Sequence, residues 1–476
     1  MSQAERFEIL ILGSGAGGKL LAWHMARAGR RTAVVERRYI GGSCPNINCM
    51  PTKNEIWSAK VSHLVRHAAQ FGTNITGSVT VDMAKVRQRK RDMVEAEIAA
   101  HVENYRASGA QLIMGSGRFV GQKTLEVGLN DGGTRTLVGD HVFINVGTRP
   151  AIPNVPGLEA ARPLTNIEAL ELDYVPAHLI VLGGGYVGLE LAQAYRRFGS
   201  EVTVIEHGLQ LMSREDPDVS NEVRRVLTDE GIRVLVGAQT LRVDGRSGRD
   251  VSLVLRMTSG EHKIQGSDIL VAAGRMPNTH GLGLKEAGVE LNEHGYVRVN
   301  DRLETTAPGV WAIGESAGSP QFTHVSVDDF QIIRENFEGG KRSTKGRLVP
   351  FCMFTDPPLA RVGMTERDAQ RERLTPRVAR LPISAVLRAH TTGEREGFMK
   401  ALVDDDDRIL GFTMFGADAD GVMTVVQTAM LAKLPHSTLR DAILTHPTMA
   451  EGLGSLLGSV PPRSVPEVTP AAAVTA

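Results

Sequence analysis

The chain has 476 residues, of which 42% are hydrophobic, so it is long enough for roughly three domains of ordinary size. Lysine and arginine together number 54, as do aspartate and glutamate, and the net charge of zero excludes the basic field of a nucleic-acid-binding protein. The N-terminal apolar run is too short for a signal peptide or a membrane span, and three cysteines cannot form a disulfide framework, so we expect a cytoplasmic protein without nucleic-acid or membrane partners.

A glycine-rich loop follows the first predicted strand, residues 7–12. Gly13, Gly15 and Gly18 are spaced as in a dinucleotide-binding loop, and a helix and a second strand ending at Glu36 come next. Glycine lets the backbone approach a pyrophosphate, whose charge is met by the N-terminus of the helix. We therefore predict a dinucleotide site in which Glu36 accepts hydrogen bonds from ribose hydroxyls.

A second copy of this pattern begins after the predicted strand 179–182, with Gly183, Gly185, Gly188 and a terminal acid, Glu206. The acid lies 23 residues beyond the first glycine in both copies, since 36 − 13 and 206 − 183 both equal 23. Ordinary glycine turns with a surface acid at each strand end are the alternative. The full order of strand, loop, helix, strand and acid in both copies argues against them, and two dinucleotide sites are predicted.

Two further predicted strands, 141–146 and 267–273, run toward Gly147 and Gly274. Both patterns are typical of crossings between two nucleotide-binding domains. The second domain is therefore predicted to be inserted within the first.

A pair of cysteines, Cys44 and Cys49, lies in the sequence GGSCPNINCMPTK ahead of a predicted helix. Five residues of regular helix rise about 7.5 Å, more than a disulfide tolerates, so Cys44 must lie in a distorted turn if the pair is to close. A thiol near a helix N-terminus and a lysine has a lowered pKa, and Cys49 and Lys53 are placed for this. The pair is therefore predicted to be redox-active.

A zinc site and a pair of buried structural thiols are the alternatives for these cysteines. Zinc would need two more ligands, and no second CxxC or Cys/His cluster appears; His63 and His67 share a helical face but are of a kind more often found at the surface. No metal site is predicted. The third cysteine, Cys352, lies in an apolar run and is predicted to belong to the core.

The C-terminal part, from Arg347 onward, predicts alternating strands that include 398–403 and 409–415. The acidic run between them, residues 404–408, is predicted to be a hairpin turn rather than a metal site. The tail from residue 460 has no periodicity and is predicted to be disordered.

A histidine near the C-terminus, His446, precedes a proline and is followed five residues later by Glu451. A carboxylate bonded to one ring nitrogen fixes the tautomer and raises the basicity of the other, as an acid–base histidine that serves a thiol requires. Such a base could reach Cys44 only through tertiary folding or from a partner chain.

The combined motifs resemble those of the class I pyridine nucleotide-disulfide oxidoreductases, the family of dihydrolipoamide dehydrogenase, glutathione reductase and mercuric reductase, and are most similar to its mercuric-reductase-like branch. They are GSGAGG, GGSCPNINCMPTK, NVGTRP, GGGYVGLE, AAGRMPNT, GVWAIGE, FTDPPLARVGMTE and HPTMAE. The resemblance implies an α/β fold with two Rossmann-like dinucleotide-binding domains, the nicotinamide domain being inserted in the FAD domain, and a C-terminal α+β dimerisation domain. The expected boundaries are 1–152 and 275–346 for the two parts of the FAD domain, 153–274 for the nicotinamide domain, 347–459 for the dimerisation domain and 460–476 for the tail.

The resemblance also implies roles for individual residues in a homodimer whose active site is shared between subunits. Cys49 would be the charge-transfer thiol and Cys44 the interchange thiol, with His446 and Glu451 of the partner subunit as the acid–base dyad. Lys53 and Glu190 resemble the ion pair beside the flavin, and Tyr186 resembles the gate over the nicotinamide pocket. The expected FAD-binding residues are Gly13, Gly15, Gly18, Glu36, Gly42, Ser43, Lys53, Gly147 and Glu315. The expected residues of the nicotinamide site are Gly183, Gly185, Tyr186, Gly188, Glu206 and Gly274.

Three departures from the family pattern are visible. Asn48 stands where a glycine is common, Glu315 replaces the aspartate that usually holds the ribityl chain, and no cysteine follows Cys352, so the C-terminal cysteine pair of mercuric reductase is missing. Glu206 favours NADH, because a carboxylate at the strand end would repel the extra phosphate of NADPH.

The leading hypothesis is an FAD-dependent NAD(P)H:disulfide oxidoreductase acting on a small disulfide or dithiol at Cys44. The second is an NAD(P)H-dependent reductase of a metal ion, Cu(II) or Hg(II), that uses the thiols as soft ligands. The third, from another class, is a non-catalytic flavin-binding structural subunit.

Overall fold

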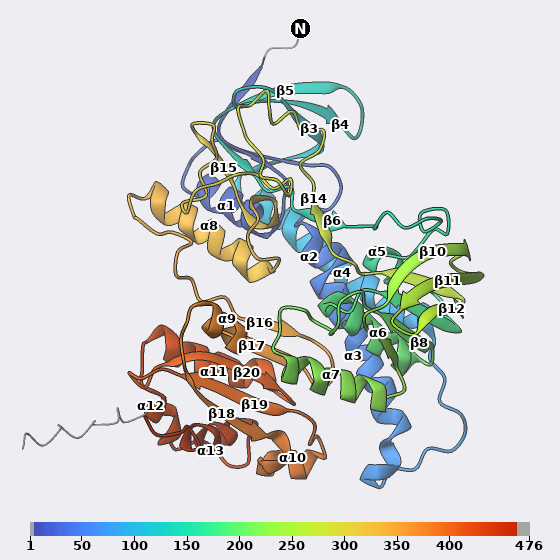
Figure 1. Cartoon of the computed structure of the whole chain (residues 1–476). Helices are drawn as coiled ribbons and strands as arrows, with labels where there is room; N and C mark the ends of the chain where they lie inside the picture. The colour runs from blue at the N-terminus through green and yellow to red at the C-terminus, as the bar shows by residue number, and fades with distance from the viewer. Residues whose placement is uncertain (1–3, 464–476) are drawn as a thin grey trace, which may run out of the picture. The chain divides into compact units, whose positions relative to one another are not determined.

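The computed structural model describes residues 4–463, which divide into two units (Figure 1). Within the described residues, the first unit comprises residues 4–213 and 227–347, and the second comprises residues 214–226 and 348–463. The predicted tail lies outside the described residues from position 464 onward. No helix in residues 4–463 is long and apolar enough to cross a bilayer.

The first unit is built on a mostly parallel sheet that carries the first glycine loop. β1 pairs in parallel with β2 and β5, β2 with β3, and β5 with β15, while β4 pairs antiparallel with β3 and β5. β2 is buried along its whole length, as strands of parallel sheets covered on both faces are. The strands are β1 (Glu5–Leu12), β2 (Thr32–Glu36), β3 (Gln111–Gly121), β4 (Thr124–Leu129), β5 (Thr134–Ile144) and β15 (Val310–Ala312).

The helices of this part pack with one another beside the sheet. α1 contacts both α4 and α8, and α3 contacts α4. They are α1 (Ala16–Arg27), α2 (Ser43–Ile47), α3 (Cys49–Arg66), α4 (Met83–Ser108) and α8 (Thr323–Phe337), with single 3-10 turns at η1 (Ala68–Phe71) and η2 (Gly314–Ala317).

A second parallel sheet, of order β13-β7-β8-β9, carries the second glycine loop. A three-stranded antiparallel sheet, β10 to β12, lies between β9 and β13 in the chain and was not predicted from the sequence. β6 (Thr148–Pro150) and β14 (Arg275–Pro277) pair antiparallel where the chain crosses between the two nucleotide units. The remaining elements are α5 (Asn166–Ala169), β7 (His178–Leu182), α6 (Tyr186–Phe198), β8 (Glu201–Ile205), β9 (Arg233–Leu235), β10 (Gln239–Arg246), β11 (Asp250–Met257), β12 (Gly260–Gly266) and β13 (Asp268–Val271).

The second unit contains a five-stranded antiparallel sheet of order β16-β17-β20-β19-β18. β19 and β20 form the expected hairpin, and Asp404 accepts hydrogen bonds from the backbone of Asp406 and Arg408 in its turn. β19 is buried at every position rather than alternately, because α11 packs on β20 and β17 while α13 packs on β18 and β19. The strands are β16 (Phe351–Met353), β17 (Leu359–Gly363), β18 (Arg377–Pro382), β19 (Phe398–Val403) and β20 (Ile409–Phe415). The helices are α9 (Glu366–Arg371), α10 (Leu387–Thr392), α11 (Ala419–Leu431), α12 (His436–Arg440) and α13 (Gly452–Gly458), with 3-10 turns η3 (Ile383–Ala385) and η4 (Met449–Glu451).

The segment Arg214–Val226, in which α7 (Pro217–Asp229) begins, packs with the second unit, although the sequence places it in the nicotinamide domain. The buried ammonium of Lys400 on β19 explains this, because it lies 2.8 Å from Asp216, 2.9 Å from Asp218 and 2.7 Å from Glu366. These three carboxylates have the spacing of metal ligands, but the ammonium of Lys400 already pairs with each of them. The division of the chain into the five segments 1–152, 153–274, 275–346, 347–459 and 460–476 stays a prediction.

Candidate functional site

The first glycine loop joins β1 to α1 and leaves the N-terminus of α1 open. Gly13 has a φ of +99°, and a Cβ there would lie 2.3 Å from the carbonyl oxygen of Asn145. A Cβ on Gly42 would lie 2.5 Å from Cα of Gly15. Two stretches of backbone therefore approach each other here at a distance that only glycine allows. The N-cap residue of α1, Gly15, provides no side-chain cap, and Gly15 and Ala16 line the cavity in front of the loop, so the positive end of the helix faces that cavity.

Two polar side chains that the sequence analysis missed hold this loop from behind. Asn145 follows β5, and its Oδ1 accepts a hydrogen bond of 2.9 Å from the N–H of Gly18 while its Nδ2 donates to the carbonyl of Ile313. Ser326 on α8 accepts from the N–H of Gly17. Both come from segments more than a hundred residues away, and although Asn145 begins the NVGTRP motif, the motif does not show that its side chain contacts this loop.

A cavity of about 750 Å³ opens in front of the loop. Its volume is that of a typical cofactor site. The glycine cradle, the open helix N-terminus and the acid at the end of β2 are suited to a dinucleotide such as FAD. The predicted site residues among its lining are Gly13, Gly15, Glu36, Gly42, Ser43, Cys44, Gly147 and Glu315.

The two predicted acids in this cavity already accept hydrogen bonds from the protein. Glu36 accepts from the backbone N–H of Ser14 through Oε2 and from those of Arg38 and Tyr39 through Oε1, so it shapes the loop as well as facing the cavity. Glu315 accepts from the hydroxyl of Thr148 and lies 3.3 Å from the guanidinium of Arg275.

The turn that carries Glu315 is fixed by a buried acid that the sequence analysis did not single out. Asp329 accepts a 2.7 Å hydrogen bond from the N–H of Gly314 and pairs with Arg347 at 2.6 Å. The longer side chain at position 315 is therefore held on a rigid turn.

The two cysteines lie on either side of a break between two helices. α2 ends at Ile47, and α3 begins at Cys49 after Asn48, whose φ and ψ are −132° and −105°. The break supplies the distortion that closure of a disulfide needs, and in this structure both cysteines are free thiols. The hydroxyl of Thr323, which lines the cavity, lies 3.4 Å from Sγ of Cys49.

The surroundings of the pair make Cys49 the acidic thiol. A hydrogen bond from the Cys44 thiol, together with Thr323 and the positive charge of Lys53, lowers the pKa of Cys49 to about 6 against the opposing effect of burial. The same contact with Cys49, together with burial, raises the pKa of Cys44. The pair shares one proton near neutral pH, with the negative charge on Cys49.

An ion pair lies on the Cys49 side of the site. Nζ of Lys53, one turn along α3, donates to Oε2 of Glu190 on α6 at 2.7 Å. Glu190 is only 4% exposed, so its charge depends on this lysine for compensation.

A second cation, which the sequence analysis missed, lies on the Cys44 side. Burial lowers the pKa of Lys19 on α1, while the charge of Cys44 acts against that shift. Lys19 shares a hydrogen bond with His101 of α4, which stacks on Trp23 at a ring separation of 5.8 Å. Burial and the charge of Lys19 lower the pKa of His101, so the imidazole is neutral at pH 7.

The second glycine loop has the same backbone geometry as the first. Gly183 has a φ of +113°, Gly185 is an N-cap without a side-chain bond, and Tyr186 begins α6. Glu206 accepts hydrogen bonds from the N–H groups of Gly184 and Gly208 at 2.7 and 2.6 Å. Elsewhere, Gly188 packs against Gly183, and Gly274 has a φ of +118° with open space around it.

The histidine–acid dyad forms within the second unit. Nδ1 of His446 lies 2.9 Å from Oε1 of Glu451, whose other oxygen accepts from the N–H of Thr448. Both contacts lower the pKa of Glu451, so the carboxylate is charged and Nε2 of the ring remains for acid–base work. The imidazole is 63% exposed. Cys352 is half-buried against the core of the same unit rather than fully inside it.

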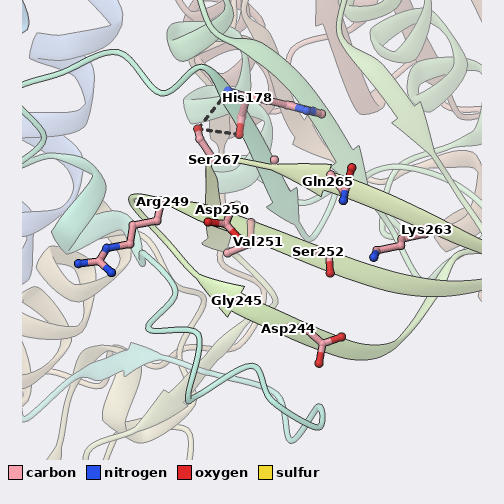
Figure 2. A pocket seen from close by; sticks show the side chains of 11 residues that line it. His178, Asp244, Gly245, Arg249, Asp250, Val251, Ser252, Lys263, Gln265 and Ser267 are labelled. Carbon is pink, nitrogen blue, oxygen red and sulfur yellow. Dashed lines mark hydrogen bonds between the residues drawn. The ribbon is translucent and has the colours of Figure 1, made fainter.

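A second cavity, of about 600 Å³, lies beside β10 to β12 (Figure 2). It includes His178 and Ser267, which are at the amino ends of β7 and β13. The second glycine loop follows the opposite, carboxyl end of β7, where dinucleotides bind in such sheets. This cavity is therefore not the nicotinamide site.

Two family models match the chain, pyridine nucleotide-disulphide oxidoreductase over residues 7–329 and the dimerisation domain of the same group over residues 349–456. Curated relatives include the probable pyridine nucleotide-disulfide oxidoreductase RclA of Escherichia coli (strain K12), which is 34% identical over 96% of this chain and 99% of its own. The mercuric reductase of Streptomyces lividans is 32% identical over 94% of each chain, and the dihydrolipoyl dehydrogenase of Bacillus subtilis (strain 168) is 33% identical over 95% of this chain and 97% of its own.

Solved structures of a relative have the same fold. The HOCl-induced flavoprotein disulfide reductase RclA from Escherichia coli superposes with a TM-score of 0.86 at 33% identity, over 96% of this chain and 100% of that one. A Cu(II) complex of the same protein has a TM-score of 0.86 at 34% identity, over 95% of this chain and 99% of that one. The fold class and the resemblance inferred from the motifs are thereby confirmed.

Proposed function

Because the chain belongs to the class I pyridine nucleotide-disulfide oxidoreductase family, and is thus a flavin-dependent enzyme with FAD and a nicotinamide cofactor, we propose that it uses NADH to reduce a small disulfide at Cys44. The observation that supports this most directly is the pair of contacting thiols at the cavity of the first glycine loop, with the charge on Cys49 and the more protonated Cys44 lining the cavity. Membership in this family is at odds with the hypothesis of a non-catalytic flavin-binding subunit.

In the proposed reaction, Cys44 and Cys49 have different roles. Cys44 gives its proton to a base and attacks one sulfur of the substrate disulfide, the substrate S–S bond breaks, and the leaving thiolate takes that proton. Cys49 then attacks Cys44, which releases the second substrate thiolate and leaves the Cys44–Cys49 disulfide. Bound FAD supplies the two-electron transfer from the nicotinamide that reduces this disulfide again. Lys53 and Glu190 hold the charge beside Cys49 during the cycle.

The proton donor in this scheme is His446 of the partner subunit. The high exposure of the imidazole, its fixed ring nitrogen and the dimerisation domain that carries it support this assignment. Ile443, three residues earlier, is fully exposed, as an apolar side chain at the edge of a subunit interface is in a single chain. We expect a homodimer by analytical ultracentrifugation and complementation of Cys44→Ser by His446→Ala in mixed dimers.

The preference for NADH rests on Glu206. Its carboxylate lies at the end of β8 beside the second glycine loop, where the extra phosphate of NADPH would meet a negative charge.

The decisive test is an anaerobic titration with NADH that follows the long-wavelength absorbance of a thiolate beside the flavin. We expect the band in the wild-type enzyme and in Cys44→Ser, and no band in Cys49→Ser. A panel of small disulfides should be reduced by the wild-type enzyme only. Loss of the band in Cys44→Ser with its retention in Cys49→Ser would reverse the two roles.

A second candidate activity is reduction of a metal ion such as Cu(II) or Hg(II). Two free, contacting sulfurs are suitable soft ligands, and the relatives include mercuric reductases and a protein solved as its Cu(II) complex. The lack of a cysteine beyond Cys352 means that any metal must reach Cys44 and Cys49 without a C-terminal cysteine relay. NADH oxidation with each ion, compared with that on disulfides, decides between the two activities.

A further inference from the structure

Asn166, the first residue of α5, forms hydrogen bonds to the break between the two helices that carry the cysteines. Its Nδ2 donates to the backbone carbonyl of Ile47 at 2.6 Å and to Oδ1 of Asn48 at 2.9 Å. Ile47 is the last residue of α2, and Asn48 is the single residue between α2 and α3. One buried side chain thus binds both residues at which the chain changes direction.

The ordinary explanation for Asn48 is helix capping, and the structure excludes it. Asparagine is favoured at the N-cap because its side chain accepts a hydrogen bond from the first turn. Asn48 is the N-cap residue of α3, yet it makes no side-chain cap bond; its side-chain oxygen accepts from Asn166 instead. Asn48, which stands where a glycine is common, therefore uses its side chain to bind Asn166.

Asn166 is itself held rigidly. The preceding Thr165 forms a capping box with Glu168, in which the hydroxyl of Thr165 donates to the carboxylate at 2.6 Å. Leu164 is bonded to β13 on both sides, donating to the carbonyl of Ile269 and accepting from the N–H of Val271, each at 2.8 Å. The segment that carries Asn166 is thus bonded to the sheet that holds the second glycine loop. Asn166 itself is only 5% exposed.

The break matters because it decides the distance between the sulfurs. In a continuous helix, residues five apart are separated by a rise of about 7.5 Å, too far for a disulfide. In the structure the Cys44 and Cys49 thiols, on either side of the break, lie close enough for each to shift the pKa of the other. A fixed break keeps the effective concentration of one thiol at the other high, and this concentration sets the stability of the disulfide they form.

We propose that Asn166 and Asn48 form a positioning pair that keeps Cys44 and Cys49 in contact and thereby stabilises their disulfide relative to the dithiol. This deepens the proposed function, because it concerns the same redox pair. The reaction at issue is the exchange in which the two thiols reduce one oxidised glutathione to two reduced glutathiones and lose their two protons as the Cys44–Cys49 bond forms.

The test is this exchange equilibrium, measured on the FAD-loaded enzyme in glutathione buffers and read by alkylation of the free thiols and mass spectrometry. We expect Asn166→Ala to lower the equilibrium constant for disulfide formation about tenfold, which corresponds to a potential about 30 mV less negative. Asn48→Ala should have a smaller effect, about threefold, because the bond from Asn166 to Ile47 remains. The double variant should resemble Asn166→Ala alone, because the two side chains share one bond.

Asn336→Ala is the matched control, since Asn336 also donates its amide to a backbone carbonyl, that of Arg342, but away from the cysteines. It should leave the equilibrium constant unchanged. A purely structural role for Asn166 would lower the melting temperature of Asn166→Ala and leave its equilibrium constant within twofold of wild type, and that result overturns the proposal. If Asn166→Ala does not fold, an unchanged constant in Asn48→Ala overturns it equally.

A second readout is the pH at which the thiolate absorbance of Cys49 disappears. A looser pair weakens the hydrogen bond from Cys44, so this pH should rise in Asn166→Ala and stay constant in Asn336→Ala. Failure of the proposed function would be recognised separately, because the wild-type enzyme would then form no Cys44–Cys49 disulfide in any buffer.

Discussion

The two glycine loops of the first unit have the same spacing and the same terminal acid, but they differ in what lies behind them. Behind the first, the side chains of Asn145 and Ser326 accept hydrogen bonds from loop N–H groups. Behind the second, the backbone of Ala272 approaches Gly183, and its methyl group faces Gly188. The first loop is held by polar side chains from distant segments, and the second by close packing.

This difference teaches that a dinucleotide motif specifies the backbone shape of the loop but does not specify which neighbouring groups hold the loop in that shape. Both loops need glycine where φ is positive and a neighbouring carbonyl is close. Only the first loop lies beside the break that carries the cysteines, so in the proposed function it would combine cofactor binding with redox chemistry, whereas the second would bind the nicotinamide coenzyme alone.

The largest effects should come from adding a methyl group at the first glycine of each loop. Gly13→Ala and Gly183→Ala place a Cβ at 2.3 and 2.4 Å from a carbonyl oxygen. We expect Gly13→Ala to purify without FAD, and Gly183→Ala to keep FAD but lose NADH-driven turnover by about 100-fold, which is ~2.7 kcal/mol of binding. Flavin absorbance and steady-state kinetics measure this. Gly29→Ala, where φ is +81° but space is open, is the control. Retention of FAD by Gly13→Ala would show that the two loops are not specialised.

Removal of the Asn145 side chain behind the first loop should weaken FAD binding more than removal of the Ala272 methyl group behind the second loop weakens NADH binding. Asn145→Ala leaves the N–H of Gly18 and the carbonyl of Ile313 without their buried partner, at a cost of about 1–3 kcal/mol. We expect FAD affinity, measured by fluorescence titration of the apoprotein, to fall about tenfold or more. Ala272→Gly removes one methyl group and should change the Michaelis constant for NADH less than threefold. Equal effects would remove the distinction between the two supports.

Coenzyme choice should depend on the acid of the second loop alone. Glu206→Gln removes the charge but keeps an oxygen near the N–H groups of Gly184 and Gly208. The ratio of kcat/KM for NADPH to that for NADH should rise about tenfold, or ~1.4 kcal/mol. Glu36→Gln should weaken FAD binding and leave this ratio of kcat/KM values unchanged. A ratio that does not move in Glu206→Gln would refute the assignment of NADH.

The smallest effect concerns the pH dependence of Cys49, which belongs to the first loop only. The pKa of Cys49 is lowered to about 6 in the folded protein, below the value of about 8.5 for an unfolded thiol. The thiolate absorbance should therefore persist at high pH and disappear as the pH falls through about 6. The stability that this thiolate contributes is complete above about pH 8.5 and is lost over the same fall.

Two variants should move this titration in opposite directions. Lys53→Met removes the positive charge and should raise the pKa of Cys49, whereas Glu190→Gln removes a negative charge and should lower it. Gly183→Ala should leave the titration in place. A shift in the same direction for both charge variants would mean that their charges do not act on Cys49.

The sequence by itself determined the elements whose cause is local. Gly13 and Gly183, the strands that precede them and the hairpin at residues 404–408 follow from periodicity and from glycine positions within a few residues of one another. The break between Cys44 and Cys49 was also predictable, because a regular helix cannot bring two cysteines at that spacing together.

Only the tertiary structure decided which distant side chains complete these local elements. Asn145 behind the first loop, Lys19 beside Cys44 and Asn166 at the helix break each come from another segment, and their neighbours in the sequence do not reveal which group each one contacts. The segment 214–226 joined the second unit for the same reason, because Lys400 lies far along the chain from the acids it neutralises. Hydrogen bonds and ion pairs act over about 3 Å of space, whatever the separation along the chain, so the partners could not be read from their neighbours in the sequence.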